Sequence, residues 1–433
     1  MNYTMYHLHS DYSLLDSCTN YKEYIDYAVS LRQKAIAFTE HGKPMGWVAK
    51  KKYCDEKGIK YIHGVECYLT EKLLWDNSEK IRDNYHTILI AKNFKGLLEI
   101  NELISRSTDK DHTYYHNRVS FDEFLQLSNN IITISACLTS PLNKLDINNP
   151  MYEKLVKRYD YLEIQSHNCQ EQKDFNTHLA IMSNKYHKPL IVGTDTHSLN
   201  KYKAECRKIL LKYKDRSYGD EDKYDLTYQT YDELVNAFII QDTLPKNIYL
   251  QAIENTNVMA DSIEDFELDK SLKYPILYGT REKDKEMFHK TIEDKFKHKV
   301  ENNIIYPEQV EAFKSAIEEE KRVLNKIEMD GFMLSMSELL SWCHDHNIPV
   351  GNARGSVGGS RVAYITDIID LNPETWHTVF SRFANEARKE VGDIDIDVIS
   401  SDRAKIFEFI ISRFGTKKTA RVPSFGTMVD NGT

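Results

Sequence analysis

Residues 3–16 read Tyr3-Thr-Met-Tyr-His-Leu-His-Ser-Asp-Tyr-Ser-Leu-Leu-Asp16, a short apolar run that passes directly into two histidines. Side chains alternate between the two faces of a strand, so the His-x-His spacing places both imidazoles on one face. The same spacing returns at Asp195 and His197, which follow the apolar run at residues 189–194. Both pairs predict strands that carry metal-binding side chains at their carboxyl ends.

Further apolar runs occupy residues 35–39, 60–65, 87–91, 131–136 and 160–165. They are rich in β-branched and aromatic residues and are separated by polar segments of helix length, a pattern typical of buried parallel strands. In closed β/α barrels the functional residues gather at the carboxyl ends of the strands. The pattern therefore predicts an α/β barrel in which side chains far apart in the sequence converge at one rim.

Nine side chains of metal-binding type lie beside these runs. They are His7, His9, Asp16, His41, Glu66, His86, Cys137, Asp195 and His197. Only His86 precedes its run instead of following it. A single histidine beside a strand is most often a core residue, but the whole set indicates a multinuclear metal site. Imidazole, carboxylate and one thiolate together favour Zn²⁺ or Mn²⁺ over Mg²⁺ alone, and such sites commonly act on phosphoryl groups.

A second candidate site begins with a loop of small residues, Ile348-Pro-Val-Gly-Asn-Ala-Arg-Gly-Ser-Val-Gly-Gly-Ser360. Glycines let backbone N–H groups approach phosphate oxygens, and the helix predicted over residues 361–365 would add a favourable dipole. Arg354 has the planar fork that can bind a phosphate through two hydrogen bonds. A plain turn explains the loop about as well, and its spacing is that of neither a Walker A loop nor a dinucleotide fingerprint.

An acidic segment follows, Val391-Gly-Asp-Ile-Asp-Ile-Asp-Val398. In a strand, alternation would place Asp393, Asp395 and Asp397 on one face. Three like charges on one face repel unless cations neutralise them, and two Mg²⁺ ions held by carboxylates are a common way to run an in-line phosphoryl displacement. The plain alternative is an acidic strand that faces solvent.

The composition is that of an ordinary globular protein, with 28% charged and 41% hydrophobic residues. A chain of 433 residues is expected to form two or three domains. The net charge of −9 argues against a uniformly basic nucleic-acid coat, although it leaves room for a local basic patch. Seven cysteines without a Cys-x-x-Cys pair indicate a reducing compartment. We expect a cytoplasmic protein that does not enter membranes.

The predicted domains occupy residues 1–275 and 276–433. Residues 229–265 show apolar positions at helical spacing, and residues 282–326 are charged and favour helix. The mixed charge of the second segment indicates a solvated helical face more than a DNA-binding stripe.

The first 200 residues resemble the polymerase-and-histidinol-phosphatase (PHP) domain. The matching stretches are His7-Leu-His-Ser-Asp-Tyr-Ser-Leu-Leu-Asp16, Phe38-Thr-Glu-His-Gly42, Gly64-Val-Glu-Cys-Tyr68, Tyr85-His-Thr-Ile, Ser135-Ala-Cys-Leu138 and Gly193-Thr-Asp-Thr-His197. The resemblance implies a distorted seven-stranded barrel that holds up to three metal ions, with every ligand position retained. Glu40 departs from the usual Asp but keeps the carboxylate. The sequence of residues 12–16, Tyr-Ser-Leu-Leu-Asp, is similar to that found at the amino terminus of bacterial DNA polymerase III alpha subunits.

Residues 330–430 are similar to the palm domain of the same polymerase family. The matches include Asp330-Gly-Phe, Ile348-Pro-Val-Gly, Arg354-Gly-Ser, Phe380-Ser-Arg-Phe-Ala-Asn385, Asp393-Ile-Asp-Ile-Asp397 and Phe425-Gly-Thr-Met428. The resemblance implies a partial, polymerase-β-like α+β palm after a helical linker, with Asp393 and Asp395 as catalytic ligands of Mg²⁺. The implied nucleotide-binding residues are Arg354, Gly355, Ser356, Gly359, Ser360 and Arg388. Asn352-Ala353 in place of Pro-Gly is a departure that would loosen nucleotide binding.

Three functional interpretations follow from the resemblance. We expect the amino-terminal part of a replicative DNA polymerase, which would act on primer–template DNA and dNTPs with replisome proteins and whose PHP site would proofread as a 3′–5′ exonuclease. The third palm carboxylate would lie beyond residue 433, so the chain alone is not expected to extend DNA and a second polypeptide would supply the rest. The alternative is a free-standing PHP-type phosphoesterase or exonuclease without polymerase activity. The complete ligand set argues against an inactive interaction module.

Overall fold

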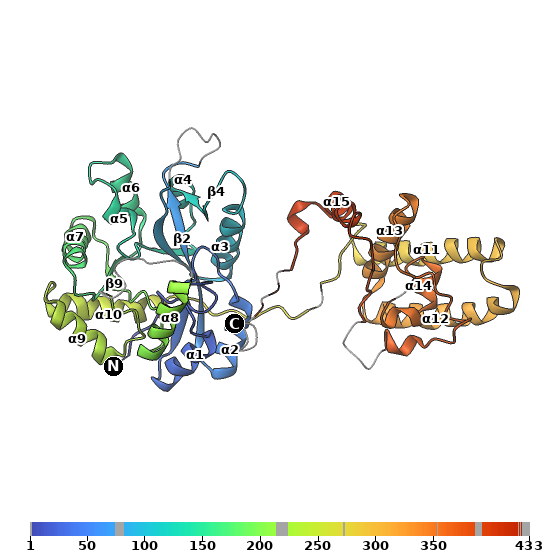
Figure 1. The fold of residues 1–433 in the computed structure, drawn as a ribbon, viewed down its shortest axis with the longest axis horizontal. Helices are drawn as coiled ribbons and strands as arrows, with labels where there is room; N and C mark the ends of the chain where they lie inside the picture. The colour runs from blue at the N-terminus through green and yellow to red at the C-terminus, as the bar shows by residue number, and fades with distance from the viewer. Residues whose placement is uncertain are drawn as a thin grey trace. The chain divides into compact units, whose positions relative to one another are not determined.

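The computed structural model describes residues 2–73, 82–213, 224–271, 273–352, 354–385, 392–422, 424 and 426. The chain forms two compact units, Met1–Leu268 and Asp269–Thr433 (Figure 1). The units meet after Leu268, whereas the sequence predicted a boundary after residue 275. Both positions lie in the segment between helix α10 (Lys246–Asp261) and helix α11 (Arg281–Glu301).

Unit 1 contains the predicted seven-stranded barrel. Its sheet runs β1 (Ala35–Phe38), β2 (Lys60–Thr70), β3 (Tyr85–Ala91), β7 (Ile131–Ile134), and a separate pair joins β8 (Leu162–Ile164) to β9 (Leu190–Val192). Single bridges close the circuit. Ile134 pairs with Tyr161, and the segment at residues 3–8 links β1 to β9 through Met5–Ile36 and Leu8–Thr196. The barrel is distorted because these junctions are bridges and not ladders.

One strand departs from the expected parallel arrangement. β3 is antiparallel to both β2 and β7, with Tyr68 opposite His86 and Ile88 opposite Ile134. The amino end of β3 therefore lies at the rim where its neighbours have their carboxyl ends. This direction explains why His86 comes before its apolar run while the other candidate ligands follow theirs.

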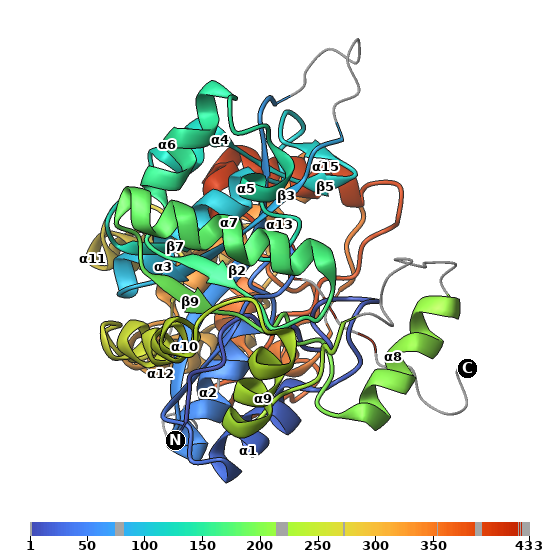
Figure 2. The ribbon, with the colours of Figure 1, turned by 90° about the vertical axis from the view of Figure 1, so that its left-hand side faces the viewer.

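Helices and short strands surround this barrel, and Figure 2 shows α7, α9 and α10 on its near side. The helices are α1 (Tyr21–Ser30), α2 (Trp47–Lys57), α3 (Phe94–Arg106), α4 (Phe121–Leu125), α5 (Pro141–Lys144), α6 (Pro150–Arg158), α7 (Gln170–Tyr186), α8 (Lys201–Tyr213), α9 (Tyr231–Gln241) and α10 (Lys246–Asp261). The short strands are β4 (Thr113–Tyr114), β5 (His116–Asn117) and β6 (Val119–Ser120). The helical prediction over residues 229–265 is confirmed as α9 and α10.

Local sequence explains where several of these helices begin. Three helices begin with a capping box: α1 after Asn20, α4 after Ser120 and α9 after Thr230. In each, the cap side chain accepts a hydrogen bond from a backbone N–H of the first turn, and the glutamate three residues later accepts one from the backbone N–H of the cap residue. This capping box satisfies N–H groups that have no partner inside the helix. The apolar faces then pack on the barrel, with Ile36, Leu89, Ile100, Leu179 and Ile253 in one buried core.

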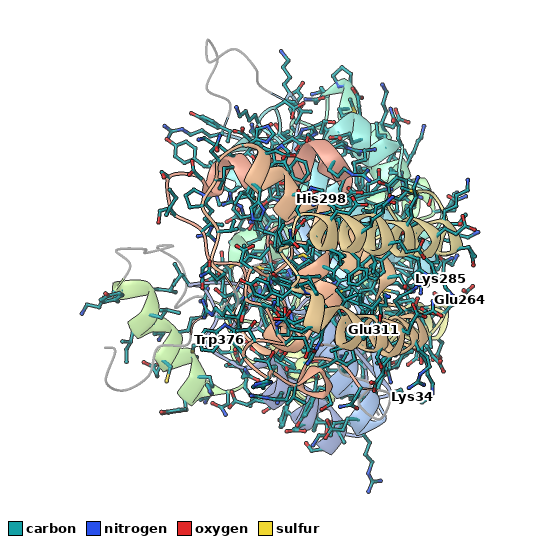
Figure 3. The ribbon with its side chains drawn as sticks, turned by 90° about the vertical axis from the view of Figure 1, so that its right-hand side faces the viewer. Lys34, Glu264, Lys285, His298, Glu311 and Trp376 are labelled. Atoms are coloured by element: carbon teal, nitrogen blue, oxygen red, sulfur yellow. The ribbon has the colours of Figure 1, made fainter. Side chains whose placement is uncertain are left out.

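Unit 2 is mainly helical in its described part. Its helices are α11 (Arg281–Glu301), η2 (Pro307–Gln309), α12 (Val310–Lys326), α13 (Asp330–Asp345), η3 (Ser356–Gly359), α14 (Arg361–Ile365), η4 (Phe380–Arg382), α15 (Arg403–Phe414) and η5 (Thr416–Lys418). Phe288, Phe313, Met333 and Val362 share its core. Lys285 and His298 lie near opposite ends of α11 and Glu311 lies in the first turn of α12 (Figure 3). The expected palm sheet is represented among the described residues by one antiparallel bridge, Val350–Val398.

Within the described ranges, no helix combines the length and the apolar character that a bilayer crossing requires.

Candidate metal centre

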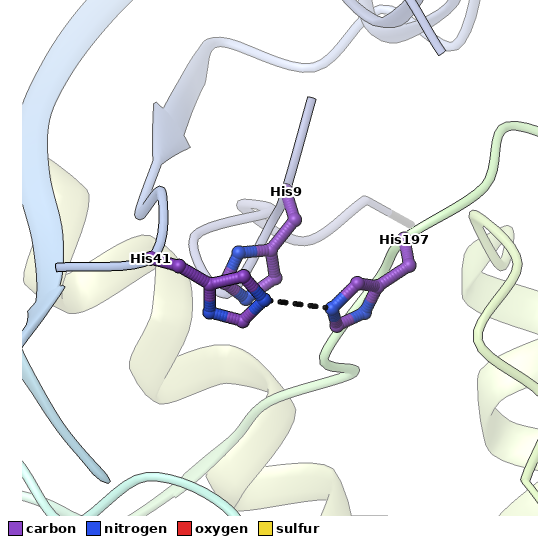
Figure 4. Close-up of side chains that lie close together, drawn as sticks. All are labelled: His9, His41 and His197. Atoms are coloured by element: carbon purple, nitrogen blue, oxygen red, sulfur yellow. Dashed lines mark hydrogen bonds between the residues drawn. The ribbon is translucent and has the colours of Figure 1, made fainter. Parts of the chain in front are cut away.

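The structure brings all nine candidate ligands of the barrel to one rim. His7 and His9 come from the first strand segment. His41 follows β1 and forms a bridge with Glu66 of β2, and His86 is the second residue of β3. Asp16, Cys137, Asp195 and His197 lie on the loops that follow strands. Three groups have donor atoms within 4.8 Å of one another: His9, His41 and His197; His7, His9, Glu66 and Asp195; and Glu66, His86 and Cys137. Figure 4 shows the first group, whose three rings face one another.

Glu66 is the centre of this arrangement, and it is fully buried. Its Oε1 lies 2.9 Å from His41 Nδ1 and 3.1 Å from His86 Nδ1. Its Oε2 lies 3.0 Å from His7 Nε2. Glu66 belongs to two of the three groups and His9 joins the remaining group to them, so the three groups form one connected centre.

Two atoms of the centre test whether these residues suit metal ions. His9 Nε2 and Asp195 Oδ1 are buried and have no hydrogen-bond partner, although they lie 3.3 Å apart. A buried polar atom without a partner is costly unless it binds an ion or water. A cation between an imidazole nitrogen and a carboxylate oxygen removes that cost, so the donor set fits divalent metal ions.

Asp16 belongs to none of the three groups but contacts two of their histidines. Its Oδ2 lies 2.8 Å from His41 Nε2 and 3.3 Å from His197 Nε2, and those two nitrogens are 3.3 Å apart. On its other side, Arg207 of α8 donates to Asp16 Oδ1 at 2.5 Å and to its carbonyl at 2.6 Å. Arg207 therefore fixes the orientation of Asp16.

Burial and charge separate the pKa values of the rim histidines. Burial lowers the pKa of His41, but Glu66 and Asp16 outweigh it and raise that pKa to about 10. Burial together with His41 and His197 holds the pKa of His9 well below its usual range. Burial opposes ionisation of Glu66, yet His86 and His41 bring its pKa well below the ordinary value. The site thus keeps Glu66 charged and His9 neutral, the forms in which they bind metals, whereas His41 must release a proton before it can bind an ion.

Glu163 on β8 is a site residue that the sequence analysis missed. Its Oε1 lies 2.7 Å from His7 Nδ1, and Tyr6 Oη and Gln165 Nε2 donate to the same carboxylate. A Cβ at Gly193 would overlap this carboxyl group, so glycine leaves room for it. The available signal was a charged residue inside a buried strand, which rarely lacks a partner. Glu163 holds the His7 ring so that Nε2 faces the centre.

A second supporting network orients His9. Its Nδ1 lies 3.1 Å from Ser13 Oγ, which donates to Glu40 Oε2 at 2.5 Å. Glu40 also pairs with the buried Lys50 at 2.5 Å. The Glu40 carboxylate therefore acts on His9 through Ser13 and does not belong to the three groups.

Backbone conformation near the ligands is unusual. Leu15, Ala136 and Asp195 have φ values of 66°, 61° and 47°. Left-handed backbone is uncommon for residues other than glycine and often marks functional sites. These turns aim Asp16, Cys137 and Asp195 inward from the ends of their strands.

The acidic segment of unit 2 keeps its predicted alternation but is not a strand. Asp393, Asp395 and Asp397 are exposed, whereas Ile394 and Ile396 pack against the core. Among the described residues, the segment pairs with another strand segment through one antiparallel bridge, from Val398 to Val350. In the described ranges the three carboxylates do not form a group of the compactness seen in the barrel.

Arg354 lies over this acidic row. Its Nη1 donates to Asp397 at 2.7 Å and its Nε lies 3.7 Å from Asp395 Oδ2. The nearby carboxylates, Asp397 first, raise the pKa of Arg354. Gly355 has a φ of 79°, and a Cβ there would lie 3.3 Å from Asp395 Oδ2. The loop expected to bind phosphate thus lies beside Asp395 and Asp397.

Two of the expected nucleotide-binding residues, Gly359 and Ser360, are buried inside unit 2. Ser360 is fully buried, and its hydroxyl donates to Glu320 of α12 at 2.7 Å. The Glu320 carboxylate also accepts the N–H groups of Arg361 and Val362, so it fills the amino terminus of α14 that was expected to attract phosphate. Gly359 is buried against the carbonyl of Val379. Arg354, Gly355 and Ser356 remain on the accessible side, and Arg388 lies outside the described residues.

Both parts of the chain are similar to known protein families. Residues 5–167 match the PHP domain family, and residues 286–433 match the bacterial DNA polymerase III alpha NTPase domain. Over 98% of its length the chain is 29% identical to the DNA polymerase III subunit alpha of Borreliella burgdorferi and 28% identical to that of Aquifex aeolicus. It spans only 37% and 38% of the length of these relatives.

Among solved structures, an amidohydrolase from Chromobacterium violaceum aligns with 45% of this chain and 87% of its own. The TM-score is 0.31 and the sequence identity is 15%.

Proposed function

We propose that the chain acts in DNA replication as part of a DNA polymerase III alpha subunit, and that its barrel removes nucleotides from DNA 3′ ends by metal-dependent hydrolysis. The matches of residues 5–167 to the PHP domain family and of residues 286–433 to the bacterial DNA polymerase III alpha NTPase domain support this proposal. The observation that supports the hydrolytic role is the connected centre built on Glu66, in which buried donor atoms of His9 and Asp195 lack hydrogen-bond partners. A packing role does not account for nine such residues at one rim.

Some residues of the centre would bind the metal ions, and others orient those ligands. The three donor groups of the centre would hold Zn²⁺ or Mn²⁺, and such ions would supply Lewis acidity and a nucleophile at neutral pH. Glu163 orients His7, the Ser13–Glu40 pair orients His9, and Arg207 orients Asp16. These supports keep the donors fixed, so little reorganisation accompanies binding of a phosphodiester.

A second activity is proposed for unit 2, where Asp393 and Asp395 face Arg354 and Gly355. These aspartates would bind Mg²⁺, and Arg354 would exchange its carboxylate partners for the phosphates of a dNTP during nucleotidyl transfer to a primer. The partners of the protein would be primer–template DNA, dNTPs and other replication proteins. Magnesium-dependent dNTP binding tests this assignment: Asp395→Asn should weaken it at least tenfold, and Glu311→Gln should leave it unchanged.

The experiment for the barrel is degradation of a 3′-labelled primer with a terminal mismatch, with Mn²⁺, Zn²⁺ or chelator. We expect metal-dependent loss of 3′ nucleotides by the wild-type chain and none by His9→Ala. His344→Ala, which changes an exposed histidine of α13, serves as the matched control. Equal hydrolysis by the His9 variant would rule out the barrel as the nuclease.

A further inference from the structure

We propose that the β4–β5 hairpin and Arg82 form a nucleotide-binding subsite beside the metal centre, in which Tyr115 stacks on a base of single-stranded DNA. This inference rests on the proposed nuclease function and specifies where its substrate is held. It concerns residues that belong neither to the nine ligands nor to the groups that orient them.

The subsite is a hollow of about 240 Å³ on unit 1. It is lined by Arg82, Asn84, Tyr114, Tyr115 and His116. Two aromatic rings, one guanidinium, one imidazole and one amide are the side chains with which proteins bind single-stranded nucleic acids, through stacking and phosphate contacts. Among the described residues, no acidic side chain lines this hollow.

Tyr115 is an exposed member of the subsite. It forms the tip of the hairpin with a φ of 58°, and the residue is 76% exposed. The Arg82 guanidinium lies 5.3 Å from the centre of its ring, and the Tyr114 ring meets it edge-on at 4.8 Å. An exposed aromatic ring on left-handed backbone contributes little to packing. Its position instead leaves an aromatic face and a cation available to a ligand.

A second arginine strengthens the aromatic platform. The Arg118 guanidinium lies 5.6 Å from the centre of the Tyr114 ring and pairs with Asp83 at 3.2 Å. Arg118 is buried, so its role is to hold Tyr114 from beneath. Arg82 is exposed and is the cation that can reach a phosphate.

Ring contacts connect the subsite to the metal centre. The Tyr68 ring lies 5.1 Å from the ring of His86, a candidate ligand, and 5.1 Å from the ring of His116. Asn117 at the end of the hairpin donates to the carbonyl of Gly42 at 2.7 Å, directly after the candidate ligand His41. The hairpin is therefore anchored to the loop that carries a candidate ligand.

Gly42 makes this anchoring possible. Its φ is 65°, and a Cβ would lie 2.8 Å from Asn117 Oδ1 and 3.1 Å from the Tyr68 ring. Any other residue would push the hairpin away from the rim. The close approach supports a joint role of the hairpin and the centre.

The test is photo-crosslinking of a ten-nucleotide single strand with 4-thiothymidine at its 3′ end, using the full chain and chelator to prevent cleavage. We expect the crosslink in residues 82–84 or 113–118. The yield should fall about tenfold in Tyr115→Ala, as expected from the loss of one stacked base, and stay near wild type in Tyr115→Phe. Because thiothymine can react with tyrosine directly, Arg82→Ala, which keeps Tyr115, must also reduce the yield.

Tyr202→Ala provides the control, since Tyr202 is 74% exposed on α8 and does not line the hollow. Crosslinks elsewhere, or yields unaffected by Tyr115→Ala and Arg82→Ala, would overturn the subsite. Primer hydrolysis is assayed in parallel. Hydrolysis that depends on His9, without an effect of these variants on crosslinking, rejects the subsite alone. Crosslinking that depends on Tyr115 without any hydrolysis rejects the nuclease function and keeps the nucleotide site.

Discussion

Glu66 and Cys137 occupy different positions in the metal centre, and this difference predicts how each substitution affects metal binding. Glu66 belongs to two of the three donor groups, whereas Cys137 belongs to one. Loss of a shared ligand should affect every ion that it contacts, while loss of a terminal ligand should affect one.

Glu66→Gln should therefore lower affinity for more than one metal ion, by about 100-fold or more, the upper part of the range known for supporting residues. Cys137→Ser should weaken only the ion held with His86. Metal content after dialysis against graded chelator, measured by mass spectrometry, distinguishes the two. Equal metal loss in both variants would contradict a bridging role for Glu66.

Glu40 and Lys50 form a buried pair behind His9, and both side chains are 1% exposed. Removing one partner leaves the other charge buried and alone. We predict that Glu40→Ala lowers the free energy of unfolding by about 3–5 kcal/mol in urea denaturation. Glu40→Ala with Lys50→Met should recover much of the loss. A single variant as stable as wild type would show that Lys50 reaches solvent.

At the scale of elements, the amino terminus of α14 depends on a side chain from another helix. Glu320 of α12 accepts hydrogen bonds from Ser360, Arg361 and Val362, and it is 2% exposed. This contact joins α12 to the end of the Arg354 loop. The charge state of Glu320 therefore matters for the stability of unit 2.

Burial raises the pKa of Glu320 to about 7, against an ordinary value of 4.5. A carboxyl group whose folded pKa is raised stabilises the fold below the unfolded pKa, and this contribution is lost as pH rises through the folded pKa. Between pH 4.5 and pH 7 the loss amounts to about 3 kcal/mol. Glu320→Gln should match wild type at pH 4.5 and be the more stable protein at pH 8.

Thermal unfolding at both pH values, followed by circular dichroism, checks this prediction. Glu319→Gln is the matched control because Glu319 is the exposed neighbour on the same helix. If Glu320→Gln destabilises the protein equally at pH 4.5 and pH 8, the carboxylate is charged throughout and acts as an ordinary cap.

At the scale of the whole molecule, the two units have separate buried cores and separate candidate sites. All nine candidate ligands of the barrel, and Glu163, Glu40 and Arg207 that support them, belong to unit 1. Folding and metal binding by this unit should therefore need no residue of unit 2.

We predict that a chain ending at residue 268 folds and binds the same number of metal ions per molecule as the full chain. Metal content and a chelator-sensitive melting temperature provide the measurement. Metal ions that bind the native state stabilise it by mass action. Chelator should therefore lower the melting temperature of both proteins to a similar extent. A short chain that is metal-free or aggregated would show that unit 2 supports the barrel.

The sequence by itself predicted the barrel and the convergence of its nine candidate ligands, because strand periodicity and the position of polar residues after apolar runs are local properties. It also indicated the alternation of Asp393, Asp395 and Asp397 with isoleucines. Only the tertiary structure decided that β3 is antiparallel, that Glu163 supports His7, that Glu320 occupies the amino terminus of α14, and that Tyr115 lies near the metal centre. Each of these depends on contacts between residues distant in the chain, and the spacing of residues along one segment carries no information about which other segment it will meet.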